Sequence, residues 1–231
     1  MAHADDTIPS RCEPLDDLLG GGFTEGEVVV VYGEARTGKT TLVLQTAIEA
    51  ARRSLKVIYV DADHSFTHQR FNQLAGEGSD AGERILLFFP DTFSAQSSLV
   101  ESVENYLTTR TRLLIIDTIT SLYRVSLGSA QETFALNREL NRQLAYLTEV
   151  AARHKLVVLL TSQVHARLDF PFGRIEPVAR RTLAHWPRTI IRIKNTSEQS
   201  KKEFILERQK GRPTGSLKCL AYITAHGFEA V

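Results

Sequence analysis

One stretch of this chain constrains its fold more than any other: an apolar strand, a glycine-rich loop and a helix-forming segment follow one another directly. The strand is residues 28–32, and helix-type periodicity begins after residue 38. Between them lies a G-x-x-x-x-G-K-T sequence made of Gly33, Glu34, Ala35, Arg36, Thr37, Gly38, Lys39 and Thr40. Glycines let such a loop turn its N–H groups towards phosphate oxygens, and the helix N-terminus adds partial positive charge. The pattern predicts a nucleoside triphosphate site, because the flanking strand and helix disfavour a chance glycine-rich turn.

The same region and one downstream acid suit the metal that accompanies a triphosphate. Lys39 would reach the β- and γ-phosphates, and the Thr40 hydroxyl would complete a Mg²⁺ shell. We include Thr41 among the nucleotide contacts. Downstream, the apolar residues 113–116 end in Asp117. A carboxylate at the end of a buried strand orients Mg²⁺ directly or through water, although an Asp there also caps a following helix.

Composition is typical of a compact intracellular protein. The 231 residues suffice for one α/β domain, so we expect a single domain over 1–231 with a short N-terminal segment, 1–14. The formal net charge is +1, so any contact with nucleic acid would come from local basic patches. Two cysteines are too few for a disulfide framework, and the sequence has no membrane-spanning run or signal pattern. We expect a cytoplasmic protein.

Apolar strands alternate with amphipathic helices over the first two thirds of the chain. The expected strands are 28–32, 56–60, 84–89, 113–117 and 156–161. The expected helical segments are 15–19, 39–53, 66–74, 95–110 and 132–153. This alternation predicts an α/β fold with a mostly parallel sheet that helices cover on both faces.

The last third of the chain has a different texture. Residues 162–188 lack periodicity and are interpreted as a long functional loop. Three strands follow, 189–194, 203–209 and 217–224. Their short connections predict antiparallel hairpins at the edge of the parallel sheet.

Polar residues also follow the strand at 56–60. Asp61 and Asp63 lie where ligands collect on such sheets, and a carboxylate there could orient or deprotonate an attacking water. For Asp61 we favour capping of the following turn. His64 and His68 have the spacing of a metal-ligand pair, but the sequence offers no third soft ligand nearby, so a zinc site is disfavoured.

Six short sequences, in order along the chain, carry a resemblance to a known family. They are LDDLLGGG at 15–22, VDAD at 60–63, DTITSL at 117–122, LTSQV at 160–164, TLAH at 182–185 and LERQKGRP at 206–213. Together they resemble the ATPase core of the RecA-like recombinases, and within them the archaeal RadA/RadB group, most closely its short RadB members. The resemblance implies a RecA-like P-loop ATPase core that binds ATP with Mg²⁺, without a separate N-terminal DNA-binding domain.

The resemblance also implies roles for individual residues. Gln163 would sense the γ-phosphate, and Arg70 would lie over the adenine face. Asp63 occupies the position of the catalytic glutamate of the family, so the catalytic set would be Lys39, Asp63, Asp117 and Gln163. Because aspartate is one methylene shorter than glutamate, we expect slow hydrolysis.

Basic residues provide two further expectations. Arg208, Lys210 and Arg212 alternate along a predicted strand, and the resemblance implies that they meet the ATP of a neighbouring subunit. A solvated basic edge is the alternative. The DNA-contacting loops of the family map to 124–131 and 164–181, and the candidate arginines are Arg124, Arg167, Arg174, Arg180 and Arg181. With Phe170 and Phe172 they would hold phosphates and stack on bases, although an arginine-rich loop is also often merely solvated.

Three hypotheses for function remain. The first is an accessory protein of homologous recombination that binds ATP and DNA, preferably single-stranded, and assists a RadA-type recombinase. The second is a strand-exchange enzyme that forms filaments by itself. The third is a KaiC-like ATPase that acts on protein partners without DNA. A homo-oligomer is compatible with each, and none involves a membrane.

Overall fold

A nine-stranded sheet forms the centre of the molecule. The structure is a computed structural model that describes residues 6–167 and 174–231. In spatial order the strands are β13 (Gly227–Ala230), β12 (Arg212–Thr224), β11 (Lys201–Gln209), β10 (Thr189–Asn195), β3 (Val28–Gly33), β7 (Val157–Ser162), β6 (Thr111–Asp117), β4 (Lys56–Asp61) and β5 (Ile85–Phe88). Pairing is parallel from β10 to β5 and antiparallel from β10 to β13. The expected α/β fold with antiparallel strands at its C-terminal edge is confirmed.

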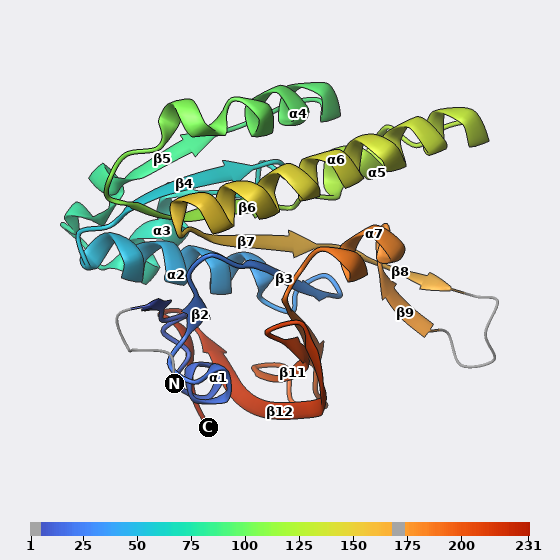
Figure 1. Ribbon diagram of the computed structural model, residues 1–231. Helices are drawn as coiled ribbons and strands as arrows, with labels where there is room; N and C mark the ends of the chain where they lie inside the picture. Colours follow the sequence, from blue (N-terminus) through green and yellow to red (C-terminus); the bar gives the residue numbers. More distant parts are fainter. Residues whose placement is uncertain (1–5, 168–173) are drawn as a thin grey trace.

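Helices cover both faces of this sheet. One face packs against α1 (Glu13–Leu19), α2 (Lys39–Arg52) and α3 (His68–Ala75). The other packs against α4 (Phe93–Glu101), α5 (Ser121–Val125), α6 (Ala130–His154) and α7 (Arg180–His185), and Figure 1 shows α6 lying along the parallel strands. Successive residues of β3 enter opposite cores, with Val29 beside α2 and Val30 on the side of α6. Burial on both faces explains the unbroken apolar run in β3.

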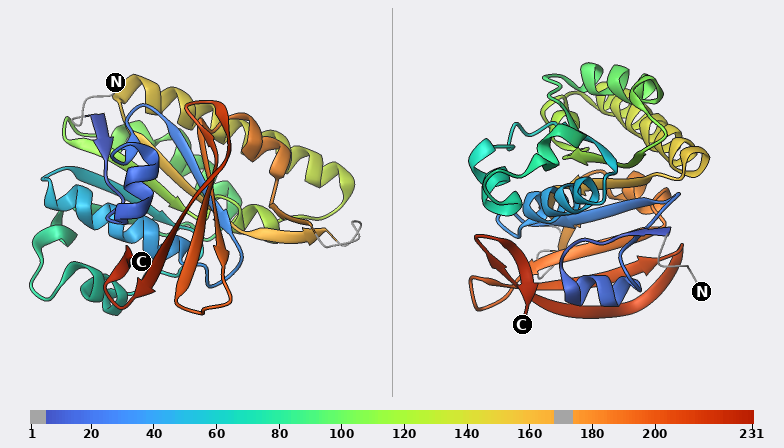
Figure 2. Two further views of the ribbon diagram at one scale, coloured as in Figure 1. Left: turned by 90° about the horizontal axis from the view of Figure 1, so that it is seen from below. Right: turned by 90° about the vertical axis from the view of Figure 1, so that its left-hand side faces the viewer.

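The antiparallel strands bend away from the plane of the parallel strands and enclose one helical layer. β12 contacts α1, and β13 contacts α2, so that α2 lies between the parallel strands and the C-terminal strands (Figure 2). Phe204 of β11 and Phe228 of β13 pack edge to face in this core, 5.0 Å between ring centroids. The C-terminal strands therefore belong to the same core as the helix that follows the glycine-rich loop.

Local signals set the ends of several helices. α1 ends at Gly20, whose φ of 80° is left-handed and favours glycine. α6 begins with a capping box, in which the Ser129 hydroxyl accepts the N–H of Glu132 and the Glu132 carboxylate accepts the N–H of Ser129. Two short 3₁₀ helices are η2 (Asp80–Arg84) and η3 (Val103–Tyr106), and β1 (Thr7–Ile8) pairs with β2 (Phe23–Thr24).

The structure corrects two expectations about the elements and confirms a third. Residues 162–188 are not an irregular loop, because β8 (Val164–Arg167) pairs with β9 (Arg174–Pro177) and α7 follows. Strand β10 forms the expected antiparallel hairpin with β11, and it joins the parallel sheet by pairing with β3 on its other side. The helix expected over 95–110 ends at Glu101, and η3 replaces its last part.

Candidate functional site

The glycine-rich loop follows β3 and leads into α2, as the sequence predicted. Gly38 is the N-cap of α2 with a φ of 93°, and a Cβ there would lie 2.6 Å from the Phe228 ring. Gly33 is required for a different reason, because a Cβ would collide with the backbone carbonyl of Ile193 in β10. The buried Thr37 hydroxyl donates to the Glu34 carbonyl, at 2.9 Å, and braces the loop from within.

Lys39 is held in place by the loop itself. Its ammonium group donates to the carbonyls of Gly33 and Glu34, both at 2.9 Å. An ammonium group has three N–H donors, so one remains for a phosphate oxygen. Burial lowers the pKa of Lys39, and nearby carboxylates, Asp117 first among them, oppose this shift. The side chain is therefore a pre-positioned donor rather than a freely solvated one.

Asp117 lies fully buried at the carboxyl end of β6. Hydroxyl groups surround its carboxylate: Tyr59 donates to Oδ2 at 3.0 Å, Thr161 donates to Oδ1, and Thr40 is a third partner. Burial raises the pKa of Asp117, and these hydrogen bonds act against that shift. A hydroxyl and a carboxylate side by side are the hard oxygen ligands that Mg²⁺ prefers, so Thr40 and Asp117 fit the expected metal.

The other strand-end acids have separate tasks. Asp61 accepts the backbone N–H groups of Ser65 and Phe66, at 3.1 and 2.7 Å, so its carboxylate caps the turn after β4 as expected. Asp63 is exposed, and the amide of Gln163 donates to its Oδ2 at 3.1 Å. Gln163 follows β7, which lies between the strands of the loop and of Asp117. The structure thus brings the expected catalytic carboxylate and the expected γ-phosphate sensor together.

Arg70 lies beside the first turn of α2. Its guanidinium donates to the Thr41 hydroxyl at 3.3 Å and to the carbonyl of Ala225, between β12 and β13, at 2.8 Å. α3 carries Arg70 in its first turn, because the Thr67 hydroxyl caps that helix by accepting the N–H of Arg70. The two expected nucleotide contacts, Thr41 and Arg70, are therefore adjacent.

The two histidines considered for a metal site, His64 and His68, contact acidic or aromatic side chains. His64 pairs with Asp91 at 3.2 Å and stacks on Phe89. His68 contacts the ring of Phe66 edge to face. Within residues 6–167 and 174–231 no group of three or more His, Cys, Asp or Glu side chains has the arrangement of a metal site.

The basic triplet of Arg208, Lys210 and Arg212 departs from expectation, because it spans the turn from β11 to β12. Lys210 and Gly211 have φ values of 49° and 80° and form the two-residue turn between Gln209 of β11 and Arg212 of β12. The expectation that the three residues alternate along one strand is therefore wrong. Arg208 is also tied to the chain, since it donates to the Ala184 carbonyl at 2.6 Å.

The DNA candidates fall on three elements. Arg124 is exposed on the short helix α5, and Arg180 and Arg181 open α7. Arg167 and Arg174 are backbone partners in the β8–β9 ladder, which projects from the edge of the molecule in Figure 1. The aromatic candidates Phe170 and Phe172 lie outside the described residues.

Two functional partners escaped the sequence interpretation. Tyr59 and Thr161 hold the Asp117 carboxylate from the neighbouring strands β4 and β7. Each is a hydroxyl-bearing residue in a buried strand that is mostly aliphatic, which is the signal that could have identified them.

Comparisons with known proteins agree with this geometry. A sequence model of the Rad51 family matches residues 7–207. The chain is 35% identical over 228 residues to the "DNA repair and recombination protein RadB" of Methanococcoides burtonii, covering 98% of this chain and 99% of that protein. It is 36% identical to the protein of that name from Thermococcus gammatolerans, covering 97% and 99%. A crystal structure of the RadB recombinase superposes with a TM-score of 0.82 at 33% identity, covering 97% of this chain and 100% of that one. The chain therefore belongs to the Rad51 family and, within it, to the RadB recombinase group.

Proposed function

We propose that this chain is an ATP-binding and DNA-binding accessory protein of homologous recombination and DNA repair, with slow ATP hydrolysis. The observation that carries the proposal is the meeting of three groups at one edge of the sheet: the held ammonium of Lys39, the buried carboxylate of Asp117 and the Asp63–Gln163 pair. Relatives named for DNA repair and recombination support the biological setting.

Each side chain has a task in ATP binding and hydrolysis. Lys39 supplies a fixed positive charge where charge develops on the γ-phosphate, and Thr40 and Asp117 offer the oxygen ligands for Mg²⁺. When bound, Mg²⁺ neutralises the β- and γ-phosphate oxygens. Asp63 would accept a hydrogen bond from the attacking water. Its carboxylate is retracted by roughly an ångström compared with glutamate, a misplacement that reduces rates by about a hundredfold.

Gln163 would couple the nucleotide site to the candidate DNA surface. Its side chain reaches Asp63, and its backbone carbonyl accepts the N–H of Val178, just beyond the β8–β9 hairpin, at 3.0 Å. A γ-phosphate that draws the amide away from Asp63 would therefore act on the base of the hairpin. The hairpin and α7 carry four of the five candidate DNA arginines. ATP would thus control the conformation of the surface that holds a single strand.

The proposed partners are single-stranded DNA and a recombinase of the same family, and a homo-oligomer is an expected assembly. Among the described residues no helix is long and apolar enough to cross a membrane. Cys12 and Cys219 are free thiols, which suits a reducing cytoplasm.

A strand-exchange assay tests the accessory role. The purified chain should exchange little DNA alone with ATP and Mg²⁺, and it should accelerate exchange by a RadA-type recombinase at limiting concentration. The Lys39→Ala variant is the matched control and should give no acceleration. Efficient exchange by the chain alone would instead assign it a self-sufficient recombinase activity.

A further inference from the structure

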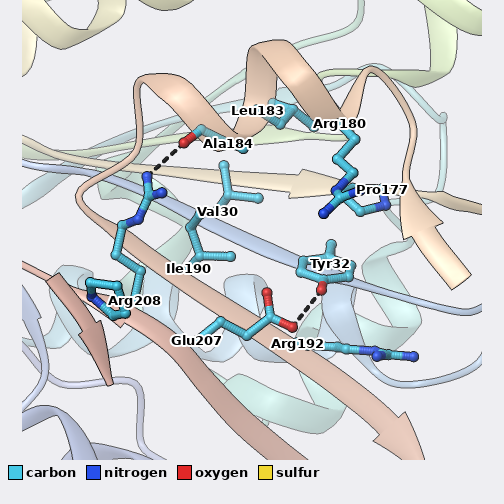
Figure 3. A pocket seen from close by; sticks show the side chains of 11 residues that line it. Val30, Tyr32, Pro177, Arg180, Leu183, Ala184, Ile190, Arg192, Glu207 and Arg208 are labelled. Atoms are coloured by element: carbon cyan, nitrogen blue, oxygen red, sulfur yellow. Dashed lines mark hydrogen bonds between the residues drawn. The ribbon is translucent and has the colours of Figure 1, made fainter. Parts of the chain in front are cut away.

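A separate cavity of about 260 Å³ lies on the sheet face next to α7. Val30 and Ile190 form its floor, and Leu183 of α7 closes it from above (Figure 3). None of the loop residues 33–40 lines it. A cavity of about 150 Å³ holds a benzene ring, so this one has room for a single planar base. The cavity therefore needs an explanation independent of the triphosphate site.

The charged groups around this cavity favour an anion. Among the described residues that line it are three with guanidinium groups, Arg180, Arg192 and Arg208, and one with a carboxylate, Glu207. Figure 3 shows Arg208 and Arg180 on opposite sides of the floor, with Arg192 at a third position. Guanidinium groups in a partly enclosed site bind phosphate well, because they present several N–H donors in one plane.

Two of these groups have orientations suited to an aromatic ring with an amino group. Arg208 is fixed by the carbonyls of Ala184 and Pro187, which both accept from its Nη1, at 2.6 and 3.3 Å, and leave the faces of the plane for stacking. Glu207 accepts the Tyr32 hydroxyl at 2.7 Å with one oxygen, and its second oxygen is turned towards the middle of the cavity (Figure 3). Burial and Glu207 raise the pKa of Tyr32, so its hydroxyl remains a donor at neutral pH.

The position of the cavity connects it to the candidate DNA surface. Pro177, the last residue of β9, and Arg180, the first of α7, both line it. A strand held by the hairpin would therefore pass its mouth. Tyr32 directly precedes Gly33 of the phosphate loop, so an occupant would also touch the strand that leads into the ATP site.

We propose that this cavity receives one nucleotide of a bound single strand, which rests on the proposed DNA-binding function. The base enters over Val30 and Ile190 and stacks on Arg208. Its exocyclic amino group donates to Glu207, and its phosphate meets Arg180 and Arg192 at the rim. Cytosine, adenine and guanine carry such an amino group, whereas thymine does not, so the cavity discriminates against thymine.

Equilibrium binding of short single-stranded oligomers tests the proposal. Wild-type protein with ATP and Mg²⁺ should bind deoxycytidine oligomers more tightly than thymidine oligomers of equal length. It should bind an abasic oligomer about tenfold more weakly than the deoxycytidine oligomer, since stacking of one base is worth this much. Equal affinity for all three oligomers would overturn the cavity assignment while leaving DNA binding intact. Failure to bind any oligomer would overturn the proposed function as well.

Glu207→Gln should abolish the preference for cytosine, because an amide also donates to the carbonyl of thymine, and it can still accept the Tyr32 hydroxyl. Glu203→Gln is the matched control on the same strand and should keep the preference, as Glu203 pairs with Lys218 outside the cavity. Arg192→Gln provides a second variant. It should weaken the binding of both the deoxycytidine and the thymidine oligomers, because it removes a charge that meets the phosphate of the seated nucleotide. Loss of association with a recombinase in Glu207→Gln, with an unchanged base preference, would assign the cavity to a protein partner and refute the proposal.

Discussion

Individual side chains at the carboxyl edge of the sheet have sharply different environments although all are polar. Asp61, Asp63 and Asp117 end or follow neighbouring strands, yet one caps a turn, one is exposed and one is buried among hydroxyl groups. The position of Asp117 at the end of an apolar strand was enough to predict it as a site residue, because a buried acid at a strand end has few structural uses. It did not identify the hydroxyl partners Tyr59 and Thr161, which come from strands distant in sequence.

Removing the ammonium group of Lys39 should abolish ATP binding without unfolding the protein. The side chain bonds only loop carbonyls and lies outside the two apolar cores, so Lys39→Ala leaves no cavity among packed helices. Calorimetric titration with Mg²⁺-ATP should show no heat of binding, while the thermal midpoint stays within a few degrees. Lys56→Ala, at the exposed start of β4, is the control and should bind normally. Undiminished affinity in Lys39→Ala would refute the site.

Lengthening Asp63 should raise turnover. In Asp63→Glu the carboxylate regains the reach that a catalytic glutamate has, so kcat should increase by about ten- to a hundredfold with little change in ATP affinity. Asp91→Glu makes the same chemical change on an exposed residue that pairs with His64, and it should leave turnover unaltered. Steady-state hydrolysis at saturating ATP measures both. An Asp63→Glu enzyme no faster than wild type would mean that another group positions the water.

Asp16 makes stability depend on pH. Its carboxylate accepts the Ser10 N–H at 2.8 Å, but burial raises its pKa from 3.8 to about 6. The folded state holds the proton more tightly than the unfolded state, so this stabilisation is complete below pH 3.8 and is lost as pH rises through about 6. When the pH is raised from 4 to 7, the free energy of unfolding of Asp16→Asn should therefore increase by about 2 kcal/mol relative to that of wild type. Urea unfolding at both pH values measures this gain, and the exposed Glu13→Gln should show much less. If the difference in unfolding free energy between Asp16→Asn and wild type were the same at both pH values, the raised pKa of Asp16 would be refuted.

At the scale of elements, the strands and helices that bury apolar residues on a regular period were predictable, and the segments after β7 were not. β3, α2, β4 and β6 lie within two residues of their expected bounds, because their patterns are long and unbroken. The β8–β9 hairpin was missed because its two strands are only four residues long, too short for a pattern to stand out. Lys210 was placed in a strand because a lysine in a left-handed turn has no distinctive sequence signal beyond the following Gly211.

Strand β10 illustrates why topology needs more than local pattern. Its sequence alternates like an edge strand, but its parallel pairing with β3 places Ile193 against Gly33. The connection that makes this possible runs through α7, an element of six residues that periodicity could not reveal. The close approach in turn explains why position 33 must be glycine.

The hairpin and α7 should contribute the salt dependence of DNA binding. Replacing Arg180 and Arg181 with alanine removes two positive charges beside the hairpin, so the slope of log K against log salt should decrease by about 1.4. Exposed Arg53 and Arg110, at the opposite edge of the sheet, provide a double-alanine control whose slope should not change. ATP affinity should be equal in both variants. Fluorescence anisotropy at several salt concentrations measures the slopes, and an unaltered slope in the first variant would exclude this surface.

At the scale of the whole molecule, the nucleotide site at the edge of the sheet and the candidate DNA surface of the hairpin and α7 are joined by a hydrogen bond. The phosphate loop and Asp117 lie at the ends of β3 and β6, on either side of β7, and Gln163, which follows β7, connects this edge to the base of the hairpin through its bond with Val178. The C-terminal strands pack Phe228 against Gly38, so the start of α2 is part of the common core. Under the proposed function, a nucleotide bound at this edge would act on the projecting β8–β9 hairpin.

A titration of single-stranded DNA tests whether ATP controls DNA binding by this protein. Single-stranded DNA binding should be measured with and without ATP and Mg²⁺, for wild type and for Lys39→Ala. We expect salt-dependent binding that tightens with ATP and Mg²⁺ in wild type and does not respond to them in Lys39→Ala. Absence of DNA binding in wild type under every condition, or identical affinity with and without nucleotide, would contradict it.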